Sequence, residues 1–104
     1  MKIETTFTIT PEHPALPGHF PGNPIVPGVV LLDELAHALK AAHPAIQLSG
    51  ISSVKFLSPL LPGEPCDIML AQGRNHSIKF ECRSGERVIA SGSFTHAPSE
   101  VHAA

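Results

Sequence analysis

Residues 19–43 read HFPGNPIVPGVVLLDELAHALKAAH and join the two features that decide the fold. The first is a proline-rich loop over residues 10–28, which holds six of the chain's 11 prolines. Proline fixes φ and removes a backbone donor, so this long loop is expected to be stiff. The second is a mostly apolar helix predicted over residues 29–43 and ended by His43-Pro44. A helix this apolar is expected to be buried on most sides.

The rest of the chain predicts a sheet. Strands are expected over residues 2–9, 47–57, 66–72, 77–83 and 87–96, and in residues 77–83 apolar and polar side chains alternate. Turns over residues 58–65 and near Asn75 and Gly85 join the last four strands. Consecutive strands with short turns indicate an antiparallel sheet. This sheet is expected to wrap around the single apolar helix, because the helix must bury most of its surface. We expect one α+β domain over residues 1–104, frayed at 97–104, with a second copy of the chain covering the remaining apolar surface.

Composition limits the class of protein. The chain has 104 residues, 15% of them charged, and a formal net charge of −2, which fits one globular domain. A pI near 6.4 argues against nucleic acid or an anionic membrane as the main partner. The longest apolar runs are too short to enter and cross a membrane. The polar start at Met1–Thr6 does not resemble a signal peptide, so a cytoplasmic location is expected.

Cys66 and Cys82 are the only cysteines. A hairpin that turns near Arg74 would bring them onto neighbouring strands. In a reducing compartment, two buried reduced thiols are favoured over a disulfide. Nothing around either thiol would activate it as a nucleophile.

Two ionisable side chains stand in surroundings that suit proton transfer. His19 lies in the stiff loop and Asp33 on the apolar helix, and together they could act as general base and general acid. Both residues also allow simpler interpretations, without a catalytic role. His19 could be solvated, and Asp33 could pair with His37 one helical turn away. These three side chains could also hold a metal ion, although no paired His/Cys motif supports one.

Gly28 falls at the expected start of the helix. Backbone N–H groups there are unpaired and the helix dipole is positive, so they could polarise a carbonyl oxygen. Alternatively, Gly28 only permits a tight entry into the helix.

The run from His19 to Asp33 resembles the signature of the 3-hydroxyacyl-acyl-carrier-protein dehydratases of fatty acid synthesis. That signature is H-F-P-G-x-P-x-x-P-G-V, with an acidic residue fourteen positions after the histidine, as here. The stretch Gly50–Phe56, then Pro59 and Pro62-Gly63-Glu64, is similar to the family's next strand and turn. The likeness covers roughly residues 13–95.

The resemblance implies the hotdog fold, a curved antiparallel sheet wrapped around one helix, in a homodimer or three dimers together. It implies that His19 is the base, that Asp33 of the other subunit is the acid, and that the Gly28 N–H binds the thioester carbonyl. We further expect the substrate to contact Phe20, Pro27, Val29 and His37. The implied reaction removes water from a 3-hydroxyacyl thioester, carried by acyl carrier protein or CoA, without a metal or redox cofactor.

The chain departs from the family pattern in two residues and in length. The acid is Asp, as in the branch that also isomerises the double bond, so isomerase activity stays open. His37 stands where glutamine is usual. The chain also lacks the N-terminal segment of the housekeeping enzymes, which suggests a specialised lipid, polyene or polyketide pathway.

Two other functions remain open from the sequence. A hotdog thioesterase would use Asp33 to direct water onto the thioester carbonyl. A non-catalytic partner subunit would bind acyl carriers without chemistry. Because acyl carrier proteins are acidic, a basic docking patch is expected, with the candidates Lys55, Arg74, Lys79, Arg83 and Arg87.

Overall fold

The computed structural model describes residues 2–12 and 25–98. Its elements are, in chain order, β1 (Lys2–Thr8), α1 (Gly28–Ala42), β2 (Leu48–Phe56), β3 (Pro65–Gln72), β4 (Ser77–Ser84) and β5 (Arg87–His96). The predicted helix and five strands are confirmed, and no boundary differs from its prediction by more than one residue. Most of the proline-rich loop, with His19 and Phe20, lies outside the described residues.

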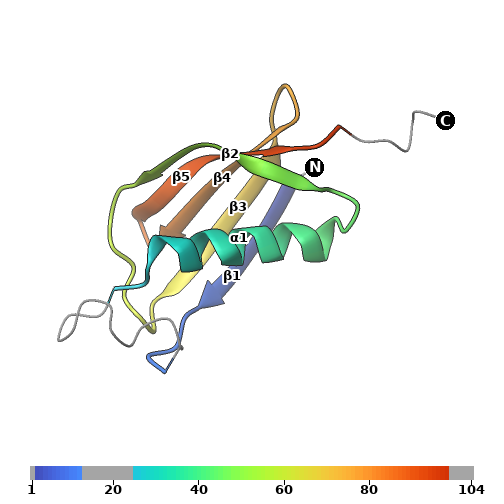
Figure 1. Cartoon of the computed structure of the whole chain (residues 1–104). Coiled ribbons are helices and arrows are strands. Elements are labelled where there is room, and N and C mark those ends of the chain that lie inside the picture. The colour runs from blue at the N-terminus through green and yellow to red at the C-terminus, as the bar shows by residue number, and fades with distance from the viewer. Residues whose placement is uncertain (1, 13–24, 99–104) are drawn as a thin grey trace.

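The strands form one antiparallel sheet in the order β1-β3-β4-β5-β2, so β1 and β2 are its edges. The sheet curves around α1, which crosses its inner face (Figure 1). This is the α+β hotdog arrangement that the sequence predicts. The hairpin turns also lie where they were expected, since Asn75 and Gly85 adopt positive φ values of 53° and 61°.

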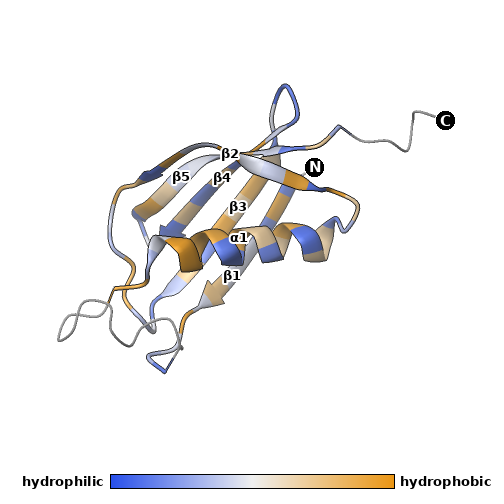
Figure 2. Cartoon of the chain, in the orientation of Figure 1, coloured by the Kyte–Doolittle hydropathy of each residue, from blue (hydrophilic) through white to orange (hydrophobic). Residues whose placement is uncertain are grey.

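The core lies between α1 and the inner face of the sheet. Strands β3 and β4 bury every second side chain along most of their length, and Figure 2 shows hydrophilic and hydrophobic residues following one another along β4. Period-two alternation turns every second side chain toward the helix. The largest fully buried side chains are Leu35, Leu39, Leu60, Leu70, Ile78 and Ile89.

The prediction that α1 is buried on most sides is wrong for the single chain. Its buried residues are Val30, near its start, and Leu31, Leu35 and Leu39, which follow one another at four-residue intervals and form one stripe against the sheet. On the opposite side Asp33 and His37 are exposed, and Val29 is 65% exposed. A straight helix that lies on one sheet can bury only the stripe that faces the sheet.

The two cysteines lie on adjacent strands, buried and unbridged, as the sequence predicts. Cys82 pairs across the β3–β4 ladder with Ile68, two residues from Cys66. A hydrogen bond to the Cys66 sulfur, together with burial, raises the pKa of the Cys82 thiol far above its ordinary value. Cys82 therefore stays protonated and unreactive in the folded chain.

Candidate active site

The start of α1 presents backbone donors that nothing in the described chain occupies. Pro27 precedes the helix without a side-chain cap, and the first turn holds no acidic residue. The Pro27 carbonyl accepts hydrogen bonds from Val30 and Leu31 at 3.0 and 3.3 Å. Among the described residues, the N–H groups of Gly28 and Val29 have no acceptor. Two free donors at the positive end of a helix suit a carbonyl oxygen that gains negative charge.

A groove of about 440 Å³ opens beside these donors. Its walls come from the segment before α1, from the first turn of α1, and from the chain that follows β2. The lining residues, mostly apolar, are Ile25, Val26, Pro27, Gly28, Leu31, Phe56, Leu57, Ser58, Pro59 and Leu60. An apolar groove with a few backbone donors at one end can hold an acyl chain and orient its polar head.

Phe56, the last residue of β2, lies directly against the helix start. A Cβ atom at position 28 would come within 2.6 Å of the Phe56 Cζ atom. Gly28 therefore has a packing role that the sequence did not reveal, because it leaves room for this ring. Phe56 itself was not among the predicted site residues, although it ends the second stretch that resembles the dehydratases.

The predicted acid lies on the exposed side of α1. Val29, Asp33 and His37 follow one another at four-residue intervals, so they share one stripe of the helix. No ion pair joins Asp33 to His37 in the part of the chain that the structure describes. The simple pairing of these two residues is therefore not observed. The structure brings Pro27, Gly28 and Val29 together, with Asp33 one turn further along, while His19 lies outside the described residues.

Four large apolar side chains on the first turn of α1, at the end of β2 and in the connection after β2 are exposed. They are Val29, Phe56, Leu57 and Leu61, which are 65%, 53%, 58% and 44% exposed in the single chain. A contiguous patch of large apolar side chains is typical of a surface that another protein or a ligand covers.

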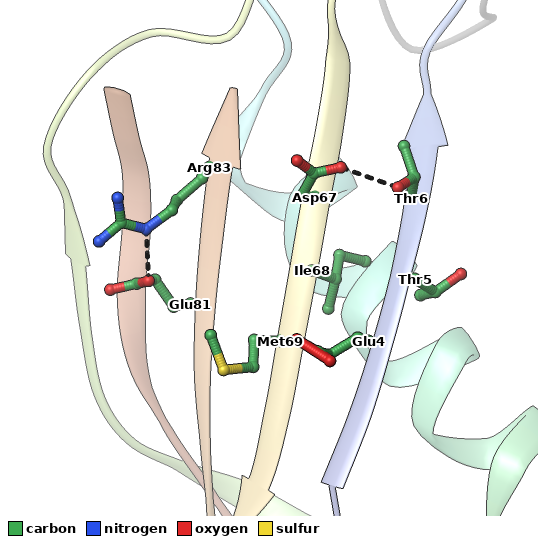
Figure 3. A pocket seen from close by; sticks show the side chains of 8 residues that line it. All are labelled: Glu4, Thr5, Thr6, Asp67, Ile68, Met69, Glu81 and Arg83. Atoms are coloured by element: carbon green, nitrogen blue, oxygen red, sulfur yellow. Dashed lines mark hydrogen bonds and ion pairs between the residues drawn. The ribbon is translucent and has the colours of Figure 1, made fainter. Parts of the chain in front are cut away.

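A second hollow, of about 370 Å³, lies on the outer face of the sheet across β1, β3 and β4 (Figure 3). Its polar side chains bond to one another: Thr6 Oγ1 donates to Asp67 at 2.8 Å, and Arg83 Nε donates to Glu81 at 2.7 Å. Such a surface is typical of the solvated face of an antiparallel sheet. Polar groups of this hollow bond to one another, whereas the N–H groups at the helix start have no acceptor among the described residues, so the helix start is the better candidate site.

The five basic candidates for carrier docking differ in their partners. Arg83 pairs with Glu81, and Arg87 pairs with Glu64 at 2.8 Å. Lys55, Arg74 and Lys79 are exposed and form no ion pair within residues 2–12 and 25–98.

Residues 2–12 and 25–98 contain neither a metal-ligand cluster nor a membrane-spanning helix. No three His, Cys, Asp or Glu side chains of that part of the chain gather where they could bind a metal ion. No helix there is long and apolar enough to cross a membrane.

Residues 1–93 match the family model described as ApeI-like, ApeI dehydratase. Curated relatives are named 3-hydroxyacyl-[acyl-carrier-protein] dehydratase FabZ. The relative from Ehrlichia chaffeensis is 32% identical over 84 residues, which cover 73% of this chain and 59% of the relative. The relative from Zymomonas mobilis is 32% identical over 108 residues, which cover 90% and 68%. The chain spans about three fifths of the length of the Ehrlichia relatives.

Solved structures share the fold. The dehydratase heterocomplex ApeI:P from Xenorhabdus doucetiae superposes with a TM-score of 0.83 at 24% identity, over 93% of this chain and 88% of that one. The fluoroacetyl-CoA-specific thioesterase FlK superposes with a TM-score of 0.67 at 15% identity, over 90% and 88%. Because dehydratases and thioesterases both appear at low identity, these likenesses show the fold alone.

Proposed function

The chain belongs to the ApeI-like dehydratase family, and on that premise we propose that it removes water from a 3-hydroxyacyl thioester to give the trans-2-enoyl thioester. One observation supports this most directly. Among the described residues the N–H groups of Gly28 and Val29 have no acceptor, and Gly28 lines an apolar groove. Removal of a proton beside a thioester carbonyl places negative charge on the carbonyl oxygen, and donors in that position stabilise such charge.

The proposed chemistry uses one base, one acid and the Gly28 N–H. Neutral His19 takes the proton from C2, and the charge that develops on the thioester oxygen is met by the Gly28 N–H. Asp33, directly or through a water that it orients, protonates the C3 hydroxyl, which leaves as water while the C2–C3 double bond forms. The reaction involves no net oxidation or reduction, so we propose that it needs neither a metal nor a redox cofactor. The substrate itself would arrive on phosphopantetheine.

We propose that the working site forms between two copies of the chain. Within the described part of the single chain, Asp33 and the apolar side chains Val29, Phe56, Leu57 and Leu61 are exposed. A second copy placed over this patch would exclude bulk water from the Asp33 carboxyl and so shield the reacting groups. In the proposed homodimer, or in three such dimers together, His19 of one copy works with Asp33 of the other.

Pro27 and Val29 flank Gly28, so we propose that they contact the substrate near its thioester. Phe20 and His37 are proposed as further contacts, and the groove beside Phe56 would take the acyl chain. If the substrate is bound to an acidic carrier protein, the exposed side chains of Lys55, Arg74 and Lys79 remain the candidates for docking it.

The test uses the purified full chain with 3-hydroxyacyl thioesters, on a carrier protein and on CoA, and follows enoyl product and free thiol in the same sample. His19→Ala and Asp33→Asn should each lower enoyl formation by about 10²–10⁴-fold. His43→Ala and Asp67→Asn are matched controls, since both residues are exposed and neither lines the groove. Both controls should leave the rate unchanged.

Two outcomes would contradict the proposal. Free thiol without enoyl product would identify a thioesterase. Neither product, from folded protein tested on several chain lengths, would favour a non-catalytic partner subunit. A catalytic partner is then the next protein to seek, because a related fold is known from a dehydratase heterocomplex.

A further inference from the structure

The connection between β2 and β3, residues 57–64, forms one wall of the apolar groove. Its Leu60 side chain is only 1% exposed. The Leu60 carbonyl accepts a hydrogen bond from the N–H of Val26 at 2.8 Å, and the N–H of Gly63 donates to the Ile9 carbonyl at 2.8 Å. The 57–64 connection therefore bonds to the chain just before the proline-rich loop and again just before α1 begins.

One side chain spans the 57–64 connection. Arg87 donates through Nη1 to Ser58 Oγ at 3.1 Å and to the Pro59 carbonyl at 3.0 Å. Through Nη2 it donates to both carboxylate oxygens of Glu64 at 2.8 Å. Glu64 also accepts a hydrogen bond from the N–H of Leu61 at 2.8 Å. A planar guanidinium can reach both halves of the connection at once, which the single ammonium group of lysine cannot.

Arg83, on the other side of the β4–β5 turn, offers a matched comparison. The side chains of Arg83 and Glu81 are 47% and 32% exposed, and those of Arg87 and Glu64 are 43% and 32% exposed. At this exposure an ion pair contributes little to stability. Arg83 and Glu81 belong to one strand that the sheet already orders, whereas Arg87 joins β5 to a separate segment.

We propose that Arg87, with Glu64 as its partner, is a positioning residue for the reaction, which sets the place of the Gly28 N–H through the 57–64 connection and Val26. This inference rests on the proposed function. Arg87 does not line the groove, so its loss should affect the placement of the donor more than the binding of the substrate. A misplacement of about 1 Å can lower a rate by about 100-fold.

The test compares Arg87→Ala with Arg83→Ala in the full chain at matched concentration. One readout is amide hydrogen exchange at the N–H groups of Val26 and Gly63, which reports the placement without any activity. The other is kcat and KM for a carrier-free 3-hydroxybutyryl pantetheine thioester, which excludes contacts with a carrier protein. Arg87→Ala should speed both exchange rates and lower kcat, each by about tenfold, with KM changed by less than about twofold. Arg83→Ala should change neither readout.

Arg87→Lys and Glu64→Gln keep the test decisive if the alanine variant does not fold. Both substitutions preserve the approximate size of the side chain, and each loses the paired contact between guanidinium and carboxylate. Each should raise the two exchange rates and lower kcat, as Arg87→Ala does.

Three outcomes would overturn the inference. If exchange at Val26 and Gly63 is unchanged in the folded variants, Arg87 does not position this segment. If exchange rises while kcat stays constant, the segment does not position the donor. If exchange rises in the variants but the unmodified chain forms no enoyl product, the proposed function is wrong. Arg87 then orders the 57–64 connection but has no role in a dehydration reaction.

Discussion

Arg83 and Arg87 flank the same β-turn, yet they stabilise different kinds of structure. Arg83 lies on the outer face of the sheet, where it pairs with Glu81 of its own strand (Figure 3). Arg87 bonds to the connection between β2 and β3, whose residues lie 23 to 29 positions away in the sequence. The outer face therefore carries contacts between residues that the strand ladder already orders. The helix side carries contacts that bring separate segments together, and the candidate site depends on those.

The largest expected difference between the two faces is in the free energy of unfolding. Leu35 on α1 is fully buried, whereas Met69 on the outer face is 36% exposed. Leu35→Ala should lower the free energy of unfolding by about 2–5 kcal/mol, because it removes buried methyl groups and leaves a cavity. Met69→Ala should lower it by less than about 1 kcal/mol. Urea denaturation at one protein concentration measures both, and equal losses would contradict the distinction between the faces.

A smaller effect is expected where Phe56 meets Gly28. Alanine favours a helix over glycine by about 1 kcal/mol, but at position 28 its Cβ would lie 2.6 Å from the Phe56 ring. We therefore expect Gly28→Ala to stabilise the chain only when Phe56 is also replaced by alanine. A double-mutant cycle measured by urea denaturation should give a coupling of about 0.5–3 kcal/mol. Additive effects would show that the ring moves aside without cost.

The smallest expected effect concerns pH. The N–H of Leu61 and, after it, the Arg87 guanidinium hold the pKa of Glu64 below its ordinary value of 4.5. Stabilisation from a lowered carboxyl pKa is fully present above pH 4.5 and is lost as the pH falls through the folded value. An NMR titration of the Glu64 carboxyl carbon should give a midpoint below pH 4.5 in the unmodified chain. In Arg87→Ala the midpoint should rise toward 4.5. Identical midpoints in the two proteins would show that the guanidinium does not act on this carboxylate.

Local patterns predicted the elements of the fold. Turn residues and, in residues 77–83, alternation of apolar and polar side chains helped to locate the strands, and the apolar run after the prolines located the helix to within one residue at each end. The same patterns could not show how much of α1 a single chain would cover, since that depends on how far one sheet reaches around the helix. The sequence places Asp33 and His37 on one stripe of the helix, and the single chain leaves this stripe exposed.

The candidate site was predicted in part. The motif from His19 to Asp33 pointed to Gly28, whose N–H is free among the described residues. Phe56 and Arg87 were not assigned these roles, because their partners are remote in sequence. Arg87 was considered only as a surface charge for carrier docking, and nothing local distinguishes it from Arg83.

The sequence by itself determined the order of elements, the two-face pattern of the strands and the residues available for acid–base chemistry, because each depends on side-chain type at short spacing. Only the tertiary structure decided that the Phe56 ring packs against Gly28 and that Arg87 donates hydrogen bonds to the 57–64 connection. It also decided that the start of α1, and not the outer face of the sheet, combines free donors with an apolar groove. These contacts follow from sheet register and from the path of the connections, which place residues together that no local pattern links.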